Sequence, residues 1–133
     1  MPILTLKLSA HAQLTDPHAL ARALTALSTQ VLNKRSDVTS VVFERIPAND
    51  WSVGGEVPAQ VLMQLDIRIT HGTNSIAEKT EFVAAAFALL PQHLAQGQKL
   101  HATSYISVQE LEATDWGYGG LTQQQRRQMA QAL

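Results

Sequence analysis

The residue best placed to do chemistry is Pro2, which follows the initiator methionine and precedes an alternating apolar and polar run over residues 3–9. If Met1 is removed, as is usual ahead of a small residue, Pro2 becomes a free secondary amine. An α-amino group titrates at roughly pH 7.7 to 8.0, and desolvation lowers its pKa because it disfavours the charged form. Such an amine can act as a general base. Proline also suits a strand start for a structural reason, because it has no N–H to donate. Both interpretations remain open at this point.

Composition narrows the classes of function. The chain has 133 residues, which favours one domain with a real core, and its formal net charge is −1. The largest clusters of basic residues are the pairs Lys34-Arg35 and Arg126-Arg127. These are too small to follow a phosphate backbone, so no nucleic-acid partner is expected. The absence of cysteine excludes disulfides and thiolate chemistry. No apolar stretch has the length of a membrane span or the form of a signal peptide, so we expect no membrane partner and a cytoplasmic location.

Hydrophobic periodicity predicts the elements that must position Pro2. Alternation predicts strands over residues 2–9, 39–46, 61–70 and 101–111. Helical spacing predicts helices over 16–33 and 75–95, with Asn74 as the cap of the second, and a short polar helix from Thr122 to Ala130. The order is therefore strand, helix, strand, repeated once.

The second half of the chain repeats the first. At an offset of 65 residues, an Asp-Trp-x-x-Gly-Gly loop recurs after the second strand of each half, Asp50, Trp51, Gly54 and Gly55 matching Asp115, Trp116, Gly119 and Gly120. The first strands of the halves match at an offset of about 61, and there Met63 falls where the first half has Pro2. Chemistry that needs a free terminus can therefore occur in only one half.

The repeat predicts a fold of α/β (α+β) class. Each strand–helix–strand unit requires parallel strands and a right-handed crossover. Two such units make a four-stranded sheet with both long helices on one face, within a single domain of two pseudo-repeats, about 1–58 and 59–133. The second and fourth strands look too apolar to face water (Val41, Val42 and Phe43; Tyr105, Ile106 and Val108), so we expect neighbouring subunits to cover the other face, with the glycine loops as edge arms.

The sequence resembles the tautomerase superfamily. The first half is similar to a 4-oxalocrotonate tautomerase subunit, over residues 34–41 (KRSDVTSV) and 44–56 (ERIPANDWSVGGE). The second half is similar to the fused, double-length members, over residues 66–75 (DIRITHGTNS) and 115–123 (DWGYGGLTQ). Together with Pro2, this doubled set covers nearly the whole chain.

The resemblance implies a homotrimer like macrophage migration inhibitory factor and the carboxymethyl-hydroxymuconate isomerases, with three sites built on terminal prolines. It implies a cofactor-independent tautomerase or isomerase that moves a proton on a small 2-oxo or 2-hydroxy-enoate acid, with Pro2 as general base. Two alternatives remain open: a hydratase or dehalogenase in which protonated Pro2 is the acid, and a non-catalytic trimeric binding protein.

The resemblance also implies further site residues. Trp51 matches the aromatic residue that lowers the dielectric around the base in half-length members, and Trp116 is its copy. The family's substrate-binding arginine falls on Ser40, and on Tyr105 in the second half. Tyr105 coincides with a tyrosine that lines the site in the inhibitory-factor branch, and Lys34 with a lysine that lies there.

The remaining candidates come from the residues themselves. Arg68 shares a strand face with Asp66, which leaves open a structural ion pair or a role for Arg68 in holding a substrate carboxylate. His71 ends the third predicted strand, where it is either a solvated turn residue or a substrate ligand. The five histidines lack metal-ligand spacing, so no metal is expected. The resemblance implies that no cofactor is needed.

Overall fold

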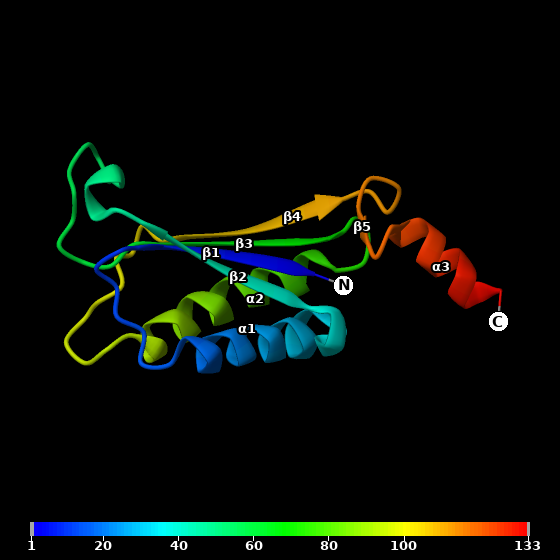
Figure 1. The fold of residues 1–133 in the computed structure, drawn as a ribbon, viewed down its shortest axis with the longest axis horizontal. Helices are drawn as coiled ribbons and strands as arrows, with labels where there is room; N and C mark the ends of the chain where they lie inside the picture. The colour runs from blue at the N-terminus through cyan, green and yellow to red at the C-terminus, as the bar shows by residue number, and fades with distance from the viewer. Residues whose placement is uncertain (1, 133) are drawn as a thin grey trace.

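The computed structural model describes residues 2–132. Figure 1 shows a sheet with two long helices along one of its faces and a third helix beyond one end. The elements in chain order are β1 (Ile3–Ser9), α1 (Pro17–Leu32), η1 (Ser36–Val38), β2 (Ser40–Ile46), η2 (Ala48–Asp50), β3 (Met63–Thr70), α2 (Ile76–Leu89), η3 (Leu90–His93), β4 (Tyr105–Leu111), β5 (Gly117–Tyr118), β6 (Leu121–Thr122) and α3 (Gln123–Gln131), the η elements being short 3-10 helices.

The main sheet has the strand order β2-β1-β3-β4. Strands β1 and β2 are parallel, β3 and β4 are parallel, and β1 and β3 are antiparallel. Ile3 pairs with Ser40 in the first unit and Gln64 with Tyr105 in the second, so both units use the same register. Because the units join through antiparallel strands, corresponding features of the two halves lie at opposite ends of the sheet.

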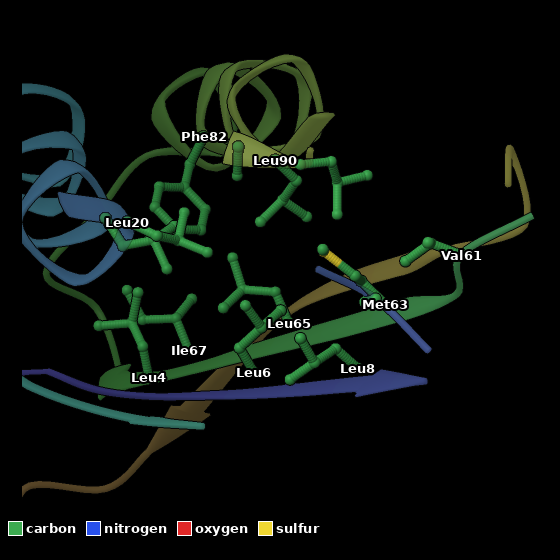
Figure 2. Close-up of a cluster of buried hydrophobic side chains, with 14 of the residues drawn as sticks. Leu4, Leu6, Leu8, Leu20, Val61, Met63, Leu65, Ile67, Phe82 and Leu90 are labelled. Atoms are coloured by element: carbon green, nitrogen blue, oxygen red, sulfur yellow. The ribbon is translucent and has the colours of Figure 1, made fainter. Parts of the chain in front are cut away.

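The core lies between the sheet and the two long helices, as predicted. Alternate residues of β1 and β3 face the helices and are fully buried, Leu6 and Leu65 among them. Figure 2 shows these side chains directed toward Leu20 of α1 and Phe82 of α2, which are also fully buried. Burial of each such side chain stabilises the fold by roughly 1.5 to 3 kcal/mol relative to its exposure.

The second and fourth strands were predicted to present an apolar surface that neighbouring subunits would cover. The apolar surface given as the reason for that prediction is not present. Val41, Phe43, Ile106 and Val108 pack against the core on the helix side. On the face away from the helices, only Val42 and Tyr105 remain as exposed large apolar side chains of the main sheet, 43% and 70% exposed. The register and the alternation of side chains give that face mostly polar residues: Thr5, Lys7, Gln64, Asp66, Arg68, Ser107 and Gln109.

The second helix is shorter than predicted and has a different cap. It ends at Leu89, and the chain continues as η3 because Pro91 has no N–H with which to extend the helix. Ser75, not Asn74, caps its start, in a reciprocal capping box with Glu78. The Asn74 side chain instead donates to the Leu32 carbonyl at the end of α1, 3.0 Å away, and so connects the two helices.

Strands β3 and β4 begin later than the predicted positions 61 and 101. Val61 makes only an isolated bridge with Leu100. The His101 ring accepts a hydrogen bond from the Thr103 backbone N–H, which holds a turn ahead of β4. The predicted alternation was correct, but local side-chain hydrogen bonds make the strand pairing begin later along the chain.

Both glycine loops are tight hairpins of the same geometry. Gly54 and Gly55 have φ angles of 61° and 83°, and Gly119 and Gly120 have 62° and 83°. Two consecutive residues with positive φ are typical of the type I′ turn that suits the twist of a two-residue hairpin, and glycine adopts it without steric cost. The sequence repeat is therefore a repeat of backbone conformation.

The second hairpin sets a steric limit at Gly117. A Cβ added there would lie 1.9 Å from the Leu121 carbonyl oxygen across the β5–β6 pair. We therefore expect Gly117→Ala to open the hairpin and lower the midpoint of thermal unfolding, measured by circular dichroism. Ser52 is the corresponding residue of the first hairpin and is exposed, so Ser52→Ala is the matched control and should leave the midpoint unchanged. An unchanged midpoint for Gly117→Ala would contradict this packing.

Candidate active site

Pro2 is buried at the start of β1, an interior strand of the sheet. Its carbonyl accepts a hydrogen bond from the Ser40 backbone N–H at 3.2 Å, which fixes it beside the start of β2. On the other side Ile3 pairs with Arg68, so the final residues of β3 flank Pro2. We name this end of the sheet, where β1 and β2 begin and β3 and β4 end, the Pro2 end. Met1 lies outside the described residues.

The opposite end, where β3 and β4 begin, is named the Met63 end. Met63 is fully buried, and its backbone N–H donates to the Ser104 hydroxyl at 3.0 Å. Its nitrogen belongs to a peptide bond and carries no basic lone pair. The second unit thus repeats the scaffold of the Pro2 end without its amine.

Lys34 lies at the Pro2 end, just after α1. It is 9% exposed, and its Nζ donates to the Thr73 hydroxyl at 2.9 Å. Burial lowers the pKa of the Lys34 ammonium, and the nearby Arg127 charge lowers it further, while Glu78 and Glu110 act in the opposite direction. Lys34 is therefore a desolvated cation that a substrate carboxylate could neutralise.

His71 belongs to an ion-pair network at the same end. Its Nδ1 lies 2.8 Å from Oε2 of Glu110, whose Oε1 lies 2.5 Å from Nζ of Lys79. The hydrogen bond from Lys79 is the largest cause of the lowered pKa of the Glu110 carboxyl, with smaller contributions from the Gly72 N–H and from His71. His71 thus has a defined partner, although its side chain is 62% exposed and open to a ligand.

The two tryptophans lie at opposite ends of the sheet. Trp116 is at the Pro2 end, where its indole N–H donates to the Thr70 hydroxyl at 3.2 Å and anchors the second hairpin to the end of β3. Trp51 is at the Met63 end, where it lines a shallow pocket of about 220 Å³ with Lys7 and Gln64. Within one chain, Trp116 is the tryptophan near Pro2.

Tyr105 also lies at the Met63 end, because it pairs with Gln64, the neighbour of Lys7 on β1. Lys7 lies five positions after Pro2, or about 16 Å away at the rise of a strand. Tyr105 is 70% exposed, so its hydroxyl-bearing side chain points away from the core of its own chain. Any contact between Tyr105 and Pro2 must therefore involve another copy of the chain.

Arg68 and Asp66 do not form the ion pair considered above: none of the ion pairs within residues 2–132 joins them. The Arg68 Nε donates instead to Oε1 of Gln109 at 3.3 Å, and Asp66 accepts from the Ser107 hydroxyl at 2.5 Å. Arg68 lies on the open face near Pro2, and its partner is a neutral amide. Its charge is therefore not neutralised by Asp66.

The structure thus gathers six of the eight candidates at the Pro2 end: Pro2, Lys34, Ser40, Arg68, His71 and Trp116. Ser40 contributes its backbone to Pro2 and is exposed beside it. Trp51 and Tyr105 lie at the Met63 end. Among residues 2–132, no three His, Asp or Glu side chains are grouped so as to hold a metal ion, and no helix there has the length and apolarity needed to cross a bilayer.

Two cationic residues near the Pro2 end were missed. Arg35 and Arg126 line a cavity of about 240 Å³ between η1, the second hairpin and α3. In the sequence they appeared only as members of two short basic pairs, 91 positions apart, and the polar composition of α3 gave no sign that it would contact the segment after α1.

The Glu110 network gives a pH dependence. Because the pKa of Glu110 is lowered in the folded chain, its ionised form stabilises the fold at neutral pH, and this contribution is lost as the pH falls through the lowered value, below about pH 4.5. We expect Glu110→Gln to lower the free energy of unfolding, measured with urea, at neutral pH and to cost progressively less below that range.

Glu112→Gln is the control, since Glu112 is exposed two residues further on, and it should change the free energy of unfolding little at either pH. A destabilisation by Glu110→Gln that stays constant down to acid pH would show that the carboxylate charge is not the source of stability.

Comparisons with known proteins complete this description. No protein-family model and no curated protein matches the sequence. Solved structures do match: a symmetric trimer of a fused 4-OT (18% identity, 92% of this chain and 96% of that chain, TM-score 0.76) and Pt0534 inactivated by 2-oxo-3-pentynoate (10% identity, 93% and 98%, TM-score 0.80). A third is the macrophage migration inhibitory factor-like protein of Entamoeba histolytica (18% identity, 91% and 97%, TM-score 0.70).

These similarities extend over nearly the full length of both chains in each comparison. The chain therefore has the double-unit fold of the tautomerase superfamily, as its sequence predicted.

Proposed function

We propose that this protein is a cofactor-independent tautomerase of small 2-oxo or 2-hydroxy-enoate acids, with the amine of Pro2 as general base. The observation that carries the proposal is the burial of Pro2 at the start of an interior strand. A secondary amine in that place is partly desolvated, which favours its neutral, proton-accepting form at neutral pH. The fold shared with fused 4-OT and with the inhibitory-factor homologue supports the same reaction class.

The proposed reaction is a proton transfer between oxygen and carbon. The Pro2 nitrogen accepts the proton of the enol hydroxyl, and the electron pair of that O–H bond forms the carbonyl. The electron pair of the carbon–carbon double bond moves to the β-carbon and takes up the proton that protonated Pro2 returns. No bond to the protein is formed. Lys34 and Arg68 hold the substrate carboxylate by charge-assisted hydrogen bonds, with Ser40 and His71 beside them. Trp116 excludes water on the side of the second hairpin.

The placement of Tyr105 and Trp51 supports a homotrimer in which each site is shared between subunits. In the proposed assembly, the Met63 end of one subunit meets the Pro2 end of the next, and the Tyr105 hydroxyl donates to the developing enolate oxygen. The two halves of each chain, about residues 1–58 and 59–133, act as one domain around a common core. A closed ring of this kind uses heterologous contacts, so every Pro2 receives the same neighbours.

Replacement of the base tests the reaction directly. General acid–base catalysis contributes about 10² to 10⁴ in rate, so Pro2→Ala should lower the enol-to-keto conversion of phenylenolpyruvate, followed by ultraviolet absorbance, well over tenfold. Pro58→Ala changes a loop proline between the first hairpin and β3 and serves as the control, with activity expected near that of the wild type. An unchanged rate for Pro2→Ala, in protein whose mass shows loss of Met1, would refute the role of Pro2.

Mixed oligomers test the shared site. Pro2→Ala and Tyr105→Phe should each be impaired alone. When the two variants are unfolded together and reassembled in equal amounts, about a quarter of the sites should combine an intact Pro2 with an intact Tyr105 from the neighbouring subunit. Activity on phenylenolpyruvate should then rise above that of either variant. The absence of any recovery in oligomers shown by native mass spectrometry to be mixed would place Tyr105 outside the site.

A further inference from the structure

A pocket at the Met63 end contains none of the residues that the proposed reaction uses. It has a volume of about 340 Å³ and is lined by residues 59–61, residues 97–99 and His11. We name it the Lys99 pocket. Its volume is within the range of roughly 300 to 1,000 Å³ that is typical of pockets for small molecules. Tyr105 and Trp51, which the proposed assembly places against the neighbouring subunit, do not line it.

Hydrogen bonds join the three segments that line the Lys99 pocket. The Ser9 N–H donates to the Leu62 carbonyl at 2.9 Å, and the Ser9 hydroxyl accepts from the Leu62 N–H at 3.0 Å. The Val61 N–H donates to the Lys99 carbonyl at 2.9 Å, and the Val61 carbonyl accepts from the His101 N–H at 2.8 Å. Figure 1 shows the segment after β1 and the segments before β3 and β4 at the same end of the sheet. The walls of the pocket therefore have a fixed arrangement.

The Gln98 side chain connects the first and third of these segments and presents a donor. Its Oε1 accepts from the Gln13 N–H at 2.7 Å, and its Nε2 donates to the His11 carbonyl at 2.9 Å. An amide nitrogen carries two hydrogens, and no hydrogen bond within residues 2–132 uses the second one. That hydrogen can donate to a ligand, and the two existing bonds fix its direction.

Lys99 supplies the charge of the pocket. It forms no ion pair within residues 2–132, and no Asp or Glu lines the pocket. The amides of Gln60 and Gln98 add neutral donors beside the ammonium. One cation matches a carboxylate better than a phosphate group, which carries a charge of about −1.5 to −2 at pH 7. The composition of the pocket therefore favours a ligand with a single negative charge.

The rest of the lining is apolar or small. Val61 is only 1% exposed and contributes an apolar surface. Ala59 and Gly97 leave space, and a Cβ added at Gly97 would have no atom within 4 Å. A short hydrocarbon chain can lie against these residues while its charged end meets Lys99.

The repeat in the sequence gives this pocket a counterpart at the other end of the sheet. At the offset of 65 residues that relates the two hairpins, Lys99 corresponds to Lys34. The residues that lead into Met63 lie along the segment of Lys99, and the Met63 nitrogen belongs to a peptide bond. The Met63 end can therefore bind an anion but lacks the amine that the proposed reaction uses.

We propose that the Lys99 pocket is a non-catalytic binding site for a small monocarboxylate. Lys99 and the second hydrogen of Gln98 Nε2 contact the carboxylate, and Val61 and Ala59 contact the hydrocarbon part. This inference goes beyond the proposed function and does not depend on it, because it assigns a ligand to the end of the sheet that has no base.

An NMR titration tests the site without any turnover. We would add butanoate to ¹⁵N-labelled protein, at low ionic strength because salt screens charged contacts, and follow the backbone amides of residues 97–99. These amides should shift in a saturable manner. Butanamide, a neutral analogue of similar shape, should bind tenfold or more weakly because it lacks the charge, and inorganic phosphate should also bind more weakly. The amides of Ser40 and Arg68 report separately on binding near Pro2.

Two substitutions test the pocket by different means. Lys99→Gln should weaken the binding of butanoate tenfold or more, whereas Lys7→Gln removes a lysine from the same end of the sheet outside the pocket and should have no effect. Ala59→Leu fills the pocket without changing its charge and should also weaken binding tenfold or more. Ala102→Leu is its control, because it adds the same side chain at an exposed position that does not line the pocket. Lys99 and Ala59 are themselves exposed, so both variants should fold.

The proposal would be overturned by the absence of a saturable shift, by equal affinity for butanoate and butanamide, or by tighter binding of phosphate. An affinity for butanoate that either Lys99→Gln or Ala59→Leu leaves unchanged would also overturn it. These results leave the role of Pro2 standing, because that role is tested by turnover of phenylenolpyruvate. Conversely, full activity of Pro2→Ala would refute the proposed reaction and leave the Lys99 pocket unaffected.

Discussion

The fold depends on the burial of the chain's first residues in the middle of the sheet. Strand β1 lies between β2 and β3, so its first residues have neighbours on both sides, and the carbonyl of Pro2 is already part of the hydrogen bonding. The residues that follow alternate into the core under both helices, and Leu4, Leu6 and Leu8 are fully buried. An amine at this place cannot move into water without breaking the pairing of an interior strand. In the proposed mature chain, the position and the desolvation of this amine therefore have the same physical cause.

Duplication with antiparallel joining explains how the other groups are distributed. Each unit alone would place its second strand, its hairpin and its tryptophan in the same relation to its own first strand. Because β1 and β3 run in opposite directions, the hairpin of the second unit lies at the Pro2 end, and the hairpin of the first unit lies at the Met63 end. The Pro2 end therefore combines the start of one unit with the end of the other. Its chemistry is asymmetric although its scaffold is not.

Much of this could be predicted from the sequence, because the relevant signals are local or repeated. The alternation in residues 3–9, the proline at the start of α1 and the paired glycines each report on a backbone conformation within a few residues. The sequence match between the two halves then predicts that the two units pair their strands in the same register. Ser40 and Tyr105 therefore occupy equivalent positions. The boundaries of β4 and of α2 were predicted less well, since hydrogen bonds from backbone N–H groups to side chains such as His101 and Ser75 decided them.

The remaining features depend on contacts that no local pattern encodes. The open face proved polar because the register directs Val41 and Ile106 to the core, while the neighbouring polar residues face outward. The cavity beside Pro2 required that Arg126 of the last helix meet the segment after α1, a contact over most of the chain. The one residue in the sequence that reflects this contact is Gly119, which leaves room for Arg126. The type I′ turn explains a glycine at that position equally well.

The central claim is that Pro2 is a free, desolvated amine that is neutral at working pH. The most direct measurement is a titration of its nitrogen by NMR, using ¹⁵N-proline in protein whose intact mass shows whether Met1 is removed. The account predicts a mature chain beginning at Pro2 and a pKa for that nitrogen at or below the ordinary α-amino range of roughly 7.7 to 8.0. Retention of Met1, or a pKa well above that range, would contradict it, and the latter result would point to protonated Pro2 as an acid.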